Sequence, residues 1–242
     1  MTRLVVLTGA GMSAESGVPT FRDALTGLWA RFDPEQLATP GAFRRDPGLV
    51  WGWYRWRAAQ LLSVQPNAGH EAVAAMERDG IDVTVVTQNV DDLHERAGST
   101  RVHHLHGHLL RSRCIDCGTS VDPDPMLAPY HGGDDGRREE PPVCSRCGGL
   151  HRPGVVWFGE ALPDDAWAAG IDALQRADRV VVVGTSGLVQ PAASLPAIAR
   201  RLGLPVLEIN PQRSALTADV DEYWAMTASA GLTRLSAELG DI

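Results

Sequence analysis

Lysine is absent from this sequence of 242 residues, and all 22 basic residues are arginines. Schiff-base enzymes, pyridoxal-phosphate enzymes and P-loop nucleotide-binding proteins each depend on a lysine side chain. The sequence therefore excludes these three classes. With 22 basic and 30 acidic residues the net charge is −8, which argues against non-specific attraction to nucleic-acid phosphates or acidic lipids. We expect neither nucleic acid nor a membrane among its partners.

Long apolar runs are also missing. Runs such as Val180–Val183 are far shorter than the roughly 20 residues that a transmembrane helix needs. The first residues, Met1–Leu4, do not resemble a secretory signal. These features predict a cytoplasmic protein, and we expect a monomer. Cysteine occurs only four times, and in a reducing compartment paired cysteines favour a metal site over disulfides.

Short β-branched runs alternate with longer helical patterns, which is typical of an α/β protein with a parallel sheet. The expected strands are residues 4–7, 83–86, 179–183 and 206–209, and the expected helices are residues 49–62, 70–78, 166–176, 192–202 and 232–239. Because the expected strands are nearly all apolar, helices should cover both faces of the sheet. The sequence thus predicts a Rossmann-like α/β fold.

Two segments interrupt this alternation. Residues from about 24 to 66 contain four of the seven tryptophans and predict a compact helical insertion. Residues 109–152 are rich in glycine, proline and charge, and they have too little apolar sequence to form a core unaided. We therefore expect residues 1–108 and 153–242 to form the Rossmann-like domain, and residues 109–152 to form a small module held together in another way.

The four cysteines form two C-x-x-C pairs separated by 26 residues, and a glycine directly follows each pair. A glycine there permits the positive φ of a tight turn, and two such turns can complete a tetrahedral four-sulfur site. This spacing predicts a zinc-ribbon module with one structural zinc ion per chain. The other interpretations are a thioredoxin-like redox pair and unrelated free thiols. The expected ligands are Cys114, Cys117, Cys144 and Cys147.

A glycine-rich loop follows the first expected strand. Residues 9–14 read Gly-Ala-Gly-Met-Ser-Ala, which fits the dinucleotide pattern G-x-G-x-x-G/A. Such glycines allow a tight turn and a close approach of the backbone to a pyrophosphate. The pattern alone is weak, because a glycine-rich turn without a ligand is the simple alternative. The acidic residue expected about 20 residues later on a second strand is missing, which argues against a plain dehydrogenase.

Further motifs, together with this loop, indicate a specific protein family. From Gly9 to Asp23 the sequence resembles the signature of the sirtuins, which are NAD-dependent protein deacylases, and the resemblance extends over almost the whole chain. The other matching segments follow in the family's order and are Thr87–Asp91, Leu105–Gly107, the four cysteines, Val155–Glu160, Gly184–Ser186 and Ile209–Asn210.

The resemblance implies a reaction and its partners. In the family, the bond between nicotinamide and ribose breaks while the acyl oxygen of an acylated lysine captures the ribose carbon. The products are nicotinamide, free lysine and O-acyl-ADP-ribose. The resemblance therefore implies NAD as the cofactor, and acylated lysine-containing proteins or peptides as substrates.

His106 matches the family's general base, since it stands in Leu105–Gly107, and a neutral imidazole can accept a proton at cellular pH. Its neighbours His103, His104 and His108 are expected to be surface or supporting residues. Asn89 and Asp91 are the other two expected catalytic residues.

The resemblance also implies the residues that bind NAD. Asn89 and Asp91 would act at the nicotinamide and ribose end, although they could instead cap a helix that begins near Asp92. Phe21 would shield the reacting carbon from water. The expected cofactor-binding residues are Gly9, Ala10, Gly11, Ser13, Ala14, Phe21, Arg22, Asp23, Gln88, Asn89, Val90, Asp91, Gly184, Thr185, Ser186, Asn210 and Ala230. The sequence around Ala230 departs from the family's glycine-containing motif.

The remaining implied contacts concern the substrate. Val155, Trp157 and Phe158 resemble the segment that pairs with the substrate backbone as an added strand, although a buried core strand has a similar sequence. Tyr54 and Arg57 are three residues apart and share a helix face. This Tyr-x-x-Arg resembles the sirtuin branch that removes succinyl and malonyl groups.

In that branch the arginine grips the acyl carboxylate and the tyrosine adds a hydroxyl donor. The alternative is that Arg57 pairs with an acidic surface residue and Tyr54 packs among the tryptophans. Removal of acetyl groups is expected as a further activity. Three other functions stay open: predominant deacetylation, ADP-ribosyl transfer to protein, and a zinc-ribbon interaction module fused to a non-catalytic nucleotide sensor.

Overall fold

The computed structural model describes residues 2–19, 37–133 and 137–240. The chain divides into two compact units, each made of more than one stretch of sequence. Unit 1 comprises Met1–Gly17, Gln65–Leu105 and Leu162–Ile242, and unit 2 comprises Val18–Val64 and His106–Ala161. Within the described ranges, no helix is both long and apolar enough to cross a bilayer.

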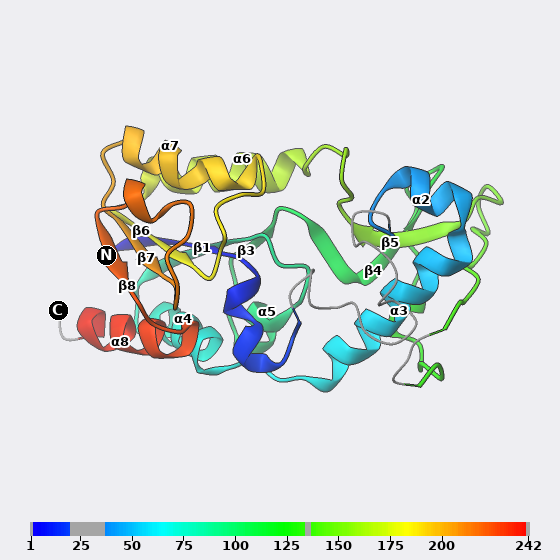
Figure 1. The fold of residues 1–242 in the computed structure, drawn as a ribbon, viewed down its shortest axis with the longest axis horizontal. Helices are drawn as coiled ribbons and strands as arrows, with labels where there is room; N and C mark the ends of the chain where they lie inside the picture. The colour runs from blue at the N-terminus through cyan, green and yellow to red at the C-terminus, as the bar shows by residue number, and fades with distance from the viewer. Residues whose placement is uncertain (1, 20–36, 134–136, 241–242) are drawn as a thin grey trace. The chain divides into compact units, whose positions relative to one another are not determined.

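Unit 1 contains, within its described residues, a sheet of six parallel strands in the order β3-β2-β1-β6-β7-β8 (Figure 1). The strands are β1 (Arg3–Thr8), β2 (Asp82–Thr87), β3 (Val102–His104), β6 (Arg179–Val183), β7 (Val206–Ile209) and β8 (Glu222–Trp224). Strand order reverses between β1 and β6. In open α/β sheets, ligands bind beyond the carboxyl ends of the strands at such a switch point.

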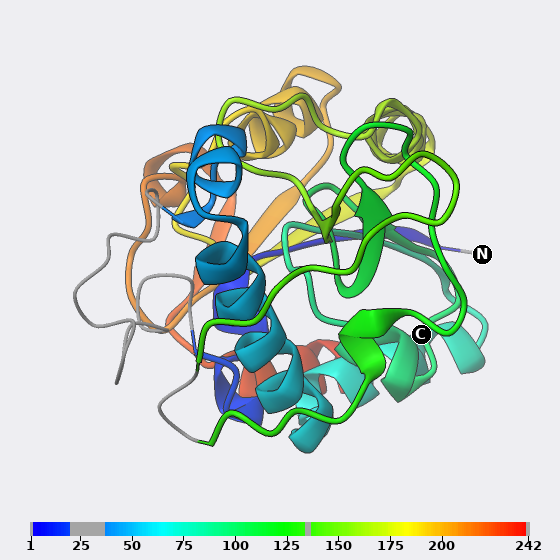
Figure 2. The same ribbon diagram turned by 90° about the vertical axis from the view of Figure 1, so that its right-hand side faces the viewer.

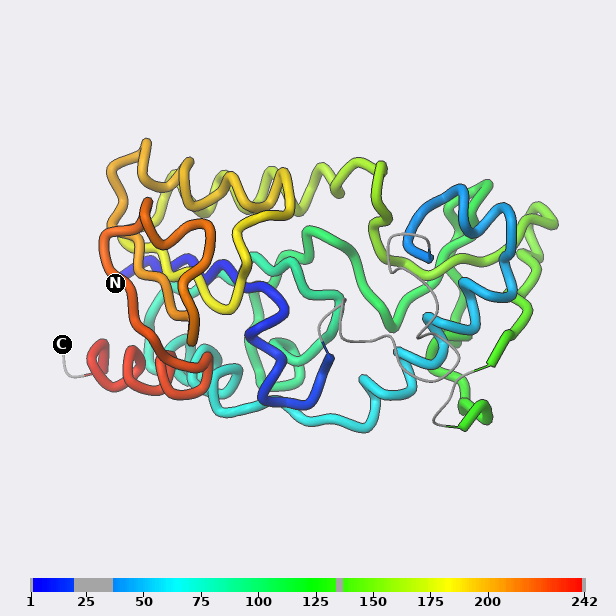
Figure 3. The backbone as a smooth tube through the Cα atoms, in the orientation of Figure 1, coloured from blue at the N-terminus to red at the C-terminus, as the bar shows by residue number. Residues whose placement is uncertain are grey.

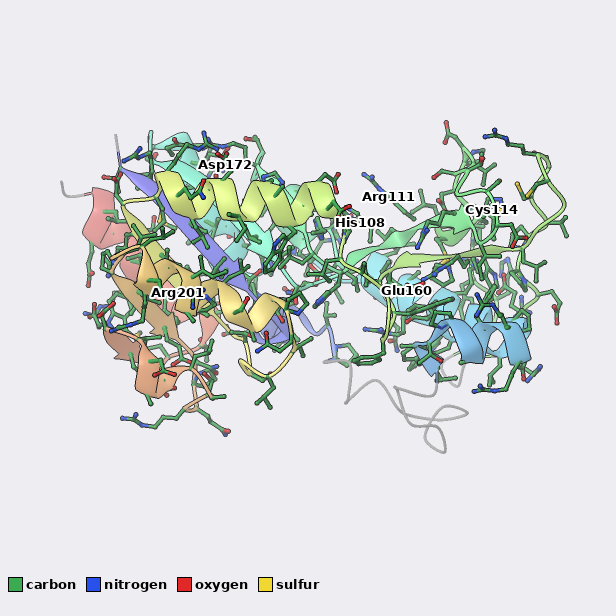
Figure 4. All side chains as sticks on the ribbon, turned by 90° about the horizontal axis from the view of Figure 1, so that it is seen from above. His108, Arg111, Cys114, Glu160, Asp172 and Arg201 are labelled. Atoms are coloured by element: carbon green, nitrogen blue, oxygen red, sulfur yellow. The ribbon has the colours of Figure 1, made fainter. Side chains whose placement is uncertain are left out.

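Helices cover both faces of this sheet, as Figure 1 shows. Side chains alternate along β1, so Leu4 and Val6 pack in the core beneath α4 and α8, while Val5 and Leu7 pack beneath α6 and α7. Figure 4 labels Asp172 on α6 and Arg201 at the end of α7, both on solvent-exposed sides. The helices are α4 (Ala68–Arg78), α5 (Leu93–Ala97), α6 (Asp164–Arg176), α7 (Leu195–Arg201) and α8 (Ala228–Gly240).

The predicted fold class is confirmed: a parallel sheet lies between two helical layers. The four predicted strands are present as β1, β2, β6 and β7, extended by at most one residue at each end. The two edge strands β3 and β8 were not predicted, because three residues carry too little periodicity to identify a strand. The predicted helix 192–202 is divided into a 3₁₀ turn, Ala192–Ser194, and helix α7.

The described residues of unit 2 form two α-helices and an antiparallel pair of strands. Its elements are α2 (Pro40–Arg45), α3 (Pro47–Ser63), β4 (Gly107–Cys114) and β5 (His151–Val155). Thr39 and Asp46 begin the two helices, because their side chains accept hydrogen bonds from Ala42 N and Leu49 N before a proline at the first helical position. Figure 2 shows α2 followed by the longer α3, both in shades of blue.

Helix α3 is the core of unit 2, since residues from Gly48 to Leu61 are buried on several sides of the helix. Described residues of the segment that links β4 to β5, traced in Figure 3, lie against this helix. A Cβ on Gly52 would lie 2.1 Å from the carbonyl oxygen of Arg137, and Glu139 N donates to Gly48 O at 3.1 Å. The tryptophan-rich insertion and the cysteine segment therefore fold together in one unit.

Candidate functional site

The loops after β1 and β6 meet backbone to backbone at the switch point of the sheet. Gly9 N donates to Val183 O at 3.0 Å, and Gly11 N donates to Gly184 O at 2.8 Å. A Cβ on Gly11 would lie 2.8 Å from Gly184 Cα, and Gly184 itself has a φ of +60°. The contact between the two loops therefore requires glycine at these positions. The dinucleotide pattern attributes its glycines to a tight turn and the approach to a pyrophosphate, and does not include this contact.

Three buried polar side chains form a hydrogen-bonded cluster beside these loops. Ser13 Oγ donates to Asp91 Oδ2 at 2.9 Å and accepts from Asn89 Nδ2 at 3.2 Å. Asn89 Nδ2 also donates to Gly9 O at 3.1 Å, so the amide joins the end of β2 to the glycine loop. Among the described residues, nothing donates to Asn89 Oδ1. The cluster therefore retains an acceptor for a ligand.

The carboxylate of Asp91 is held in place from two sides. Its Oδ2 accepts from Ser13, and its Oδ1 accepts from Leu93 N at 3.2 Å in the first turn of α5. Burial raises the pKa of Asp91, while these two hydrogen bonds oppose the shift. The alternative stated above was that Asp91 caps a helix that begins near Asp92. The bond from Leu93 N matches this alternative, and the bond from Ser13 does not.

A second layer of hydroxyls and imidazoles supports this cluster. Thr87 Oγ1 accepts from Thr8 Oγ1 at 2.7 Å and from Asn89 N at 2.9 Å. His104 Nδ1 lies 3.0 Å from Asn89 O, and its Nε2 lies 2.7 Å from Glu95 Oε1. His104 is thus a supporting residue, as predicted. The roles of Thr8 and Thr87 were missed, although a threonine directly before each loop was a visible signal.

The loops after β6 and β7 add further predicted residues to the same edge of the sheet. Gln88 Nε2 donates to Thr185 Oγ1 at 3.1 Å, and Asn210 Nδ2 donates to Thr185 O at 2.9 Å. Ser186 is exposed, with its Oγ 3.4 Å from Leu188 N. Unit 1 therefore brings together the predicted residues from the ends of β2, β6 and β7.

The other predicted residues of unit 1 lie at its surface or are partly buried. Val90 is half-buried between Asn89 and Asp91, and Ala10 and Ala14 are exposed in the two 3₁₀ turns after β1. Ala230 is exposed in the first turn of α8. Phe21, Arg22 and Asp23 lie outside the described residues.

A buried carboxylate fixes the loop after β7 and was not predicted. Glu208 is fully buried in β7, where it accepts from Ser214 Oγ at 2.5 Å and from Thr217 Oγ1 at 2.6 Å. A charged residue within an otherwise apolar strand was the available signal. These bonds hold the loop that begins at Asn210.

The four cysteines of unit 2 lie together as predicted, and each C-x-x-C forms a turn. Gly118 and Gly148 have φ values of +71° and +79°, and their amides donate to Cys114 O and Cys144 O. The four Sγ atoms lie within 4.8 Å of one another, with 3.4 Å between Cys114 and Cys147. A tetrahedron with bonds of about 2.3 Å to zinc has edges of roughly 3.8 Å, so the cluster can hold that ion.

His106 stands directly before β4 and has a half-buried side chain. Its carbonyl accepts from Val156 N at 2.8 Å. The next residue, Gly107, has a φ of +74°, and a Cβ there would lie 2.2 Å from Gly154 O. Only glycine fits this position, which explains why a glycine follows the histidine. Figure 4 shows the strand continuing from there through His108 and Arg111 to Cys114.

The segment after β5 is fixed by its own hydrogen bonds. The amides of Val156 and Phe158 donate to His106 O and Ala38 O, and Trp157 N donates to Glu160 Oε2. Val155 and the side chain of Trp157 are buried, whereas Phe158 is exposed. The amides of Val156, Trp157 and Phe158 are therefore used within unit 2, and strand pairing with a substrate stays a prediction.

An ion pair that was not predicted holds this segment. Arg152 is 2% exposed and binds both oxygens of Glu160, at 2.5 and 2.9 Å. Its Nη2 also donates to Val155 O at 2.8 Å. Glu160, labelled in Figure 4, thereby joins the end of β5 to the turn that follows it.

Tyr54 and Arg57 both lie on α3, with 2% and 8% of their surfaces exposed. The ring of Tyr54 packs edge-on against Trp53 at 4.7 Å, which matches part of the alternative stated above. Its hydroxyl accepts from Trp157 Nε1 at 3.1 Å. The Arg57 guanidinium lies 5.1 Å from the centre of the Trp53 ring. Burial raises the pKa of Tyr54 to about 12, and the charge of Arg57 opposes this shift. The two side chains thus share one electrostatic environment.

Comparisons with known proteins agree with this geometry. The model of the Sir2 family matches residues 9–191. NAD-dependent protein deacylase 1 of Pseudomonas aeruginosa is 55% identical over 213 residues, covering 87% of this chain and 83% of that protein. A crystal structure of a Sir2 homolog–NAD complex is 47% identical with a TM-score of 0.89, covering 98% of this chain and 89% of that one. A structure of Sir2 bound to acetylated peptide is 30% identical with a TM-score of 0.83, covering 98% and 93%.

Proposed function

The chain belongs to the Sir2 family, and we propose that it is an NAD-dependent protein deacylase that prefers succinyl and malonyl groups on lysine. Deacylation of proteins follows from its family and from relatives named for that activity. The acyl preference rests on one observation, the buried pair of Tyr54 and Arg57 on α3. Acetyl groups are expected as poorer substrates, because a short neutral chain has no carboxylate for this pair to bind.

The polar residues at the carboxyl edge of the parallel sheet fit a dinucleotide. They follow neighbouring strands at the switch point where such ligands bind, and Ser13, Asn89, Asp91 and Thr185 among them are buried. We assign NAD binding to the predicted residues at this edge, and assign Phe21, Arg22 and Asp23 to it from the sequence. Bound NAD would supply the ribose carbon that receives the acyl oxygen, with nicotinamide as the leaving group.

Asn89, Asp91 and Ser13 act here as a preorganised polar cluster. Because Ser13 both donates to Asp91 and accepts from Asn89, its hydroxyl hydrogen points toward Asp91. Asn89 Oδ1 is then the acceptor offered to an amide or hydroxyl group of the ligand. Asp91 provides the negative charge that stabilises a cationic sugar, and its two hydrogen bonds keep the carboxylate oriented.

His106 serves as the general base in this proposal. A neutral imidazole accepts a proton from a ribose hydroxyl, and its backbone is fixed by the bond from Val156 N to His106 O and by the turn at Gly107. His104 is not the base, because both of its ring nitrogens already have partners within unit 1.

The cysteine cluster of unit 2 binds one structural zinc ion in this proposal. Four thiolates fill all positions of a tetrahedral ion, which leaves none for substrate or water. The ion would join the end of β4 to the turn before β5 and so stabilise the segment that carries Arg152 and Trp157.

The acyl preference is argued from charge and hydrogen bonding. Arg57 can bind a terminal carboxylate through two parallel N–H donors, and Tyr54 adds a hydroxyl donor on the same helix face. Burial strengthens both interactions, because water does not compete for the carboxylate. A hydrogen bond to a charged group contributes about 1.5–3 kcal/mol, or roughly 10- to 150-fold in selectivity.

Parallel assays with acetyl, malonyl and succinyl peptides plus NAD, analysed by mass, test this function. Arg57→Met is expected to lower kcat/KM for the succinyl peptide far more than for the acetyl peptide. Arg45→Met, an exposed arginine of α2, is the matched control and should change neither. Equal losses on both peptides would refute the carboxylate contact. A peptide that gains ADP-ribose mass would instead indicate ADP-ribosyl transfer.

We further propose that the chain acts as a cytoplasmic monomer on acylated proteins, without a nucleic-acid or membrane partner. The net charge of −8 supports the last part of this proposal.

A further inference from the structure

Trp157 links the segment after β5 to the helix that carries Tyr54. Its indole Nε1 donates to Tyr54 Oη at 3.1 Å, and both side chains are 2% exposed. The two residues are 103 positions apart in the sequence. Their contact therefore joins the predicted peptide-binding segment to the predicted acyl-binding helix inside unit 2.

This contact determines which hydrogen-bonding role is left to Tyr54. A phenol has one O–H donor, and its oxygen accepts. Because Trp157 donates to the oxygen, the tyrosine does not donate in this contact, and no described residue accepts its O–H. Burial raises the pKa of Tyr54 to about 12, so the hydroxyl keeps its hydrogen at neutral pH. Tyr54 is thereby prepared to donate to a ligand.

The indole is held firmly enough to orient its partner. The Arg152 guanidinium lies 3.4 Å from the centre of the Trp157 ring, and Phe43 packs against that ring at 5.4 Å. Glu160 Oε2 accepts both Trp157 N at 2.8 Å and Arg152 Nη2 at 2.9 Å. Backbone and ring of Trp157 are thus anchored by the same buried ion pair.

We propose that Trp157 is a positioning residue for acyl selection: its indole N–H orients the Tyr54 hydroxyl to donate to the carboxylate end of an acidic acyl group. This inference rests on the acyl preference proposed above. It predicts a defect in selectivity, because an acetyl group has no carboxylate to accept that hydrogen bond. A role in packing alone would lower the turnover of all acyl peptides together.

A double-mutant cycle tests the inference through the ratio of kcat/KM for succinyl and acetyl peptides. Trp157→Phe keeps an aromatic ring without the donor, and Tyr54→Phe removes the hydroxyl. Losing the orienting bond is expected to lower the ratio about three- to tenfold in Trp157→Phe. In the double variant the ratio should equal that of Tyr54→Phe alone, because no hydroxyl remains to be oriented. Trp167→Phe, in unit 1, is the matched control and should leave the ratio unchanged.

Two results would overturn the inference. One is an equal loss on both peptides in Trp157→Phe. The other is a further fall of the same factor when Trp157→Phe is added to Tyr54→Phe. Should Trp157→Phe fail to fold, replacing Trp157 by benzothienylalanine gives the same test, because sulfur takes the place of N–H in a ring of the same shape.

The wild-type protein separates failure of this inference from failure of the proposed function. A wild-type ratio that does not favour succinyl overturns both the acyl preference and the role of Trp157. A wild-type ratio that favours succinyl, together with additive effects of the two substitutions, overturns only the role of Trp157.

Discussion

Replacing Arg55 by methionine is expected to destabilise unit 2 without involving the reaction. Arg55 precedes Arg57, the residue proposed to select the acyl group, by two positions and is also buried, at 2% exposed. It donates to the carbonyl oxygens of Met126, Ala128 and Pro129 at 2.8–3.1 Å. One buried arginine on α3 therefore holds the segment between the two cysteine pairs.

The magnitude follows from the partners that the substitution leaves behind. Three carbonyls lose a charged donor, and Glu139 loses an ion pair at 3.2 Å in which its side chain is 26% exposed. Removing one partner of a buried charged network costs about 3–5 kcal/mol. In a protein of this size that corresponds to a fall in Tm of roughly 6–20 °C. Tryptophan fluorescence during heating measures it, because three tryptophans lie on α3.

Two controls accompany this measurement. Arg55→Lys is expected to recover only part of the loss, since an ammonium group cannot bind three separate carbonyls in the geometry of a guanidinium. Arg45→Met on the exposed side of α2 should change Tm by less than about 2 °C. A fall of less than about 2 °C in Arg55→Met would show that the segment does not depend on these bonds.

Three further outcomes are expected. His106→Ala should reduce nicotinamide release at least about 100-fold while Tm and zinc content stay unchanged, and full activity would exclude the histidine as the base. Cys114→Ser should lose zinc and unfold unit 2, as measured by metal analysis and proteolysis; a soluble, active protein without zinc would contradict the structural role of the ion. Stability should fall as the pH decreases from about 6.5 to 4. Burial lowers the pKa of His70 to about 4 and that of His94 well below its usual value, so the unfolded chain binds protons first. For His70 the slope is about 1.4 kcal/mol per pH unit below 6.5, and a flat profile in denaturant titrations would refute it.

Gly9 and Gly11 show which part of the glycine-rich loop the sequence motif predicts and which part depends on the fold. The G-x-G-x-x-A motif correctly indicates the loop at the switch point of the sheet. The contact that requires Gly9 and Gly11 comes from Gly184, more than 170 residues later. A local pattern cannot identify that partner, because the approach of the two loops depends on β1 and β6 being neighbours.

Helix α3 likewise contains one arginine whose role the sequence predicts and one whose role only the structure shows. The sequence identifies Tyr54 and Arg57 as sharing a helix face, and the structure agrees that both are on α3. The sequence gives no role to Arg55, although it is also an arginine of this tryptophan-rich helix. Only the carbonyls of residues 126–129, brought over α3 by the fold, give Arg55 its structural role.

The sequence by itself determined the fold class, the turns of the two C-x-x-C pairs and the order of the polar residues after each strand. These features depend on local spacing: apolar runs form buried parallel strands, and a parallel sheet brings the ends of its strands to one edge. Tertiary structure alone decided which polar atoms pair, which glycines allow two backbones to approach, and that Trp157 reaches Tyr54. Those contacts join residues far apart in the chain, where neither periodicity nor propensity carries information about the partner.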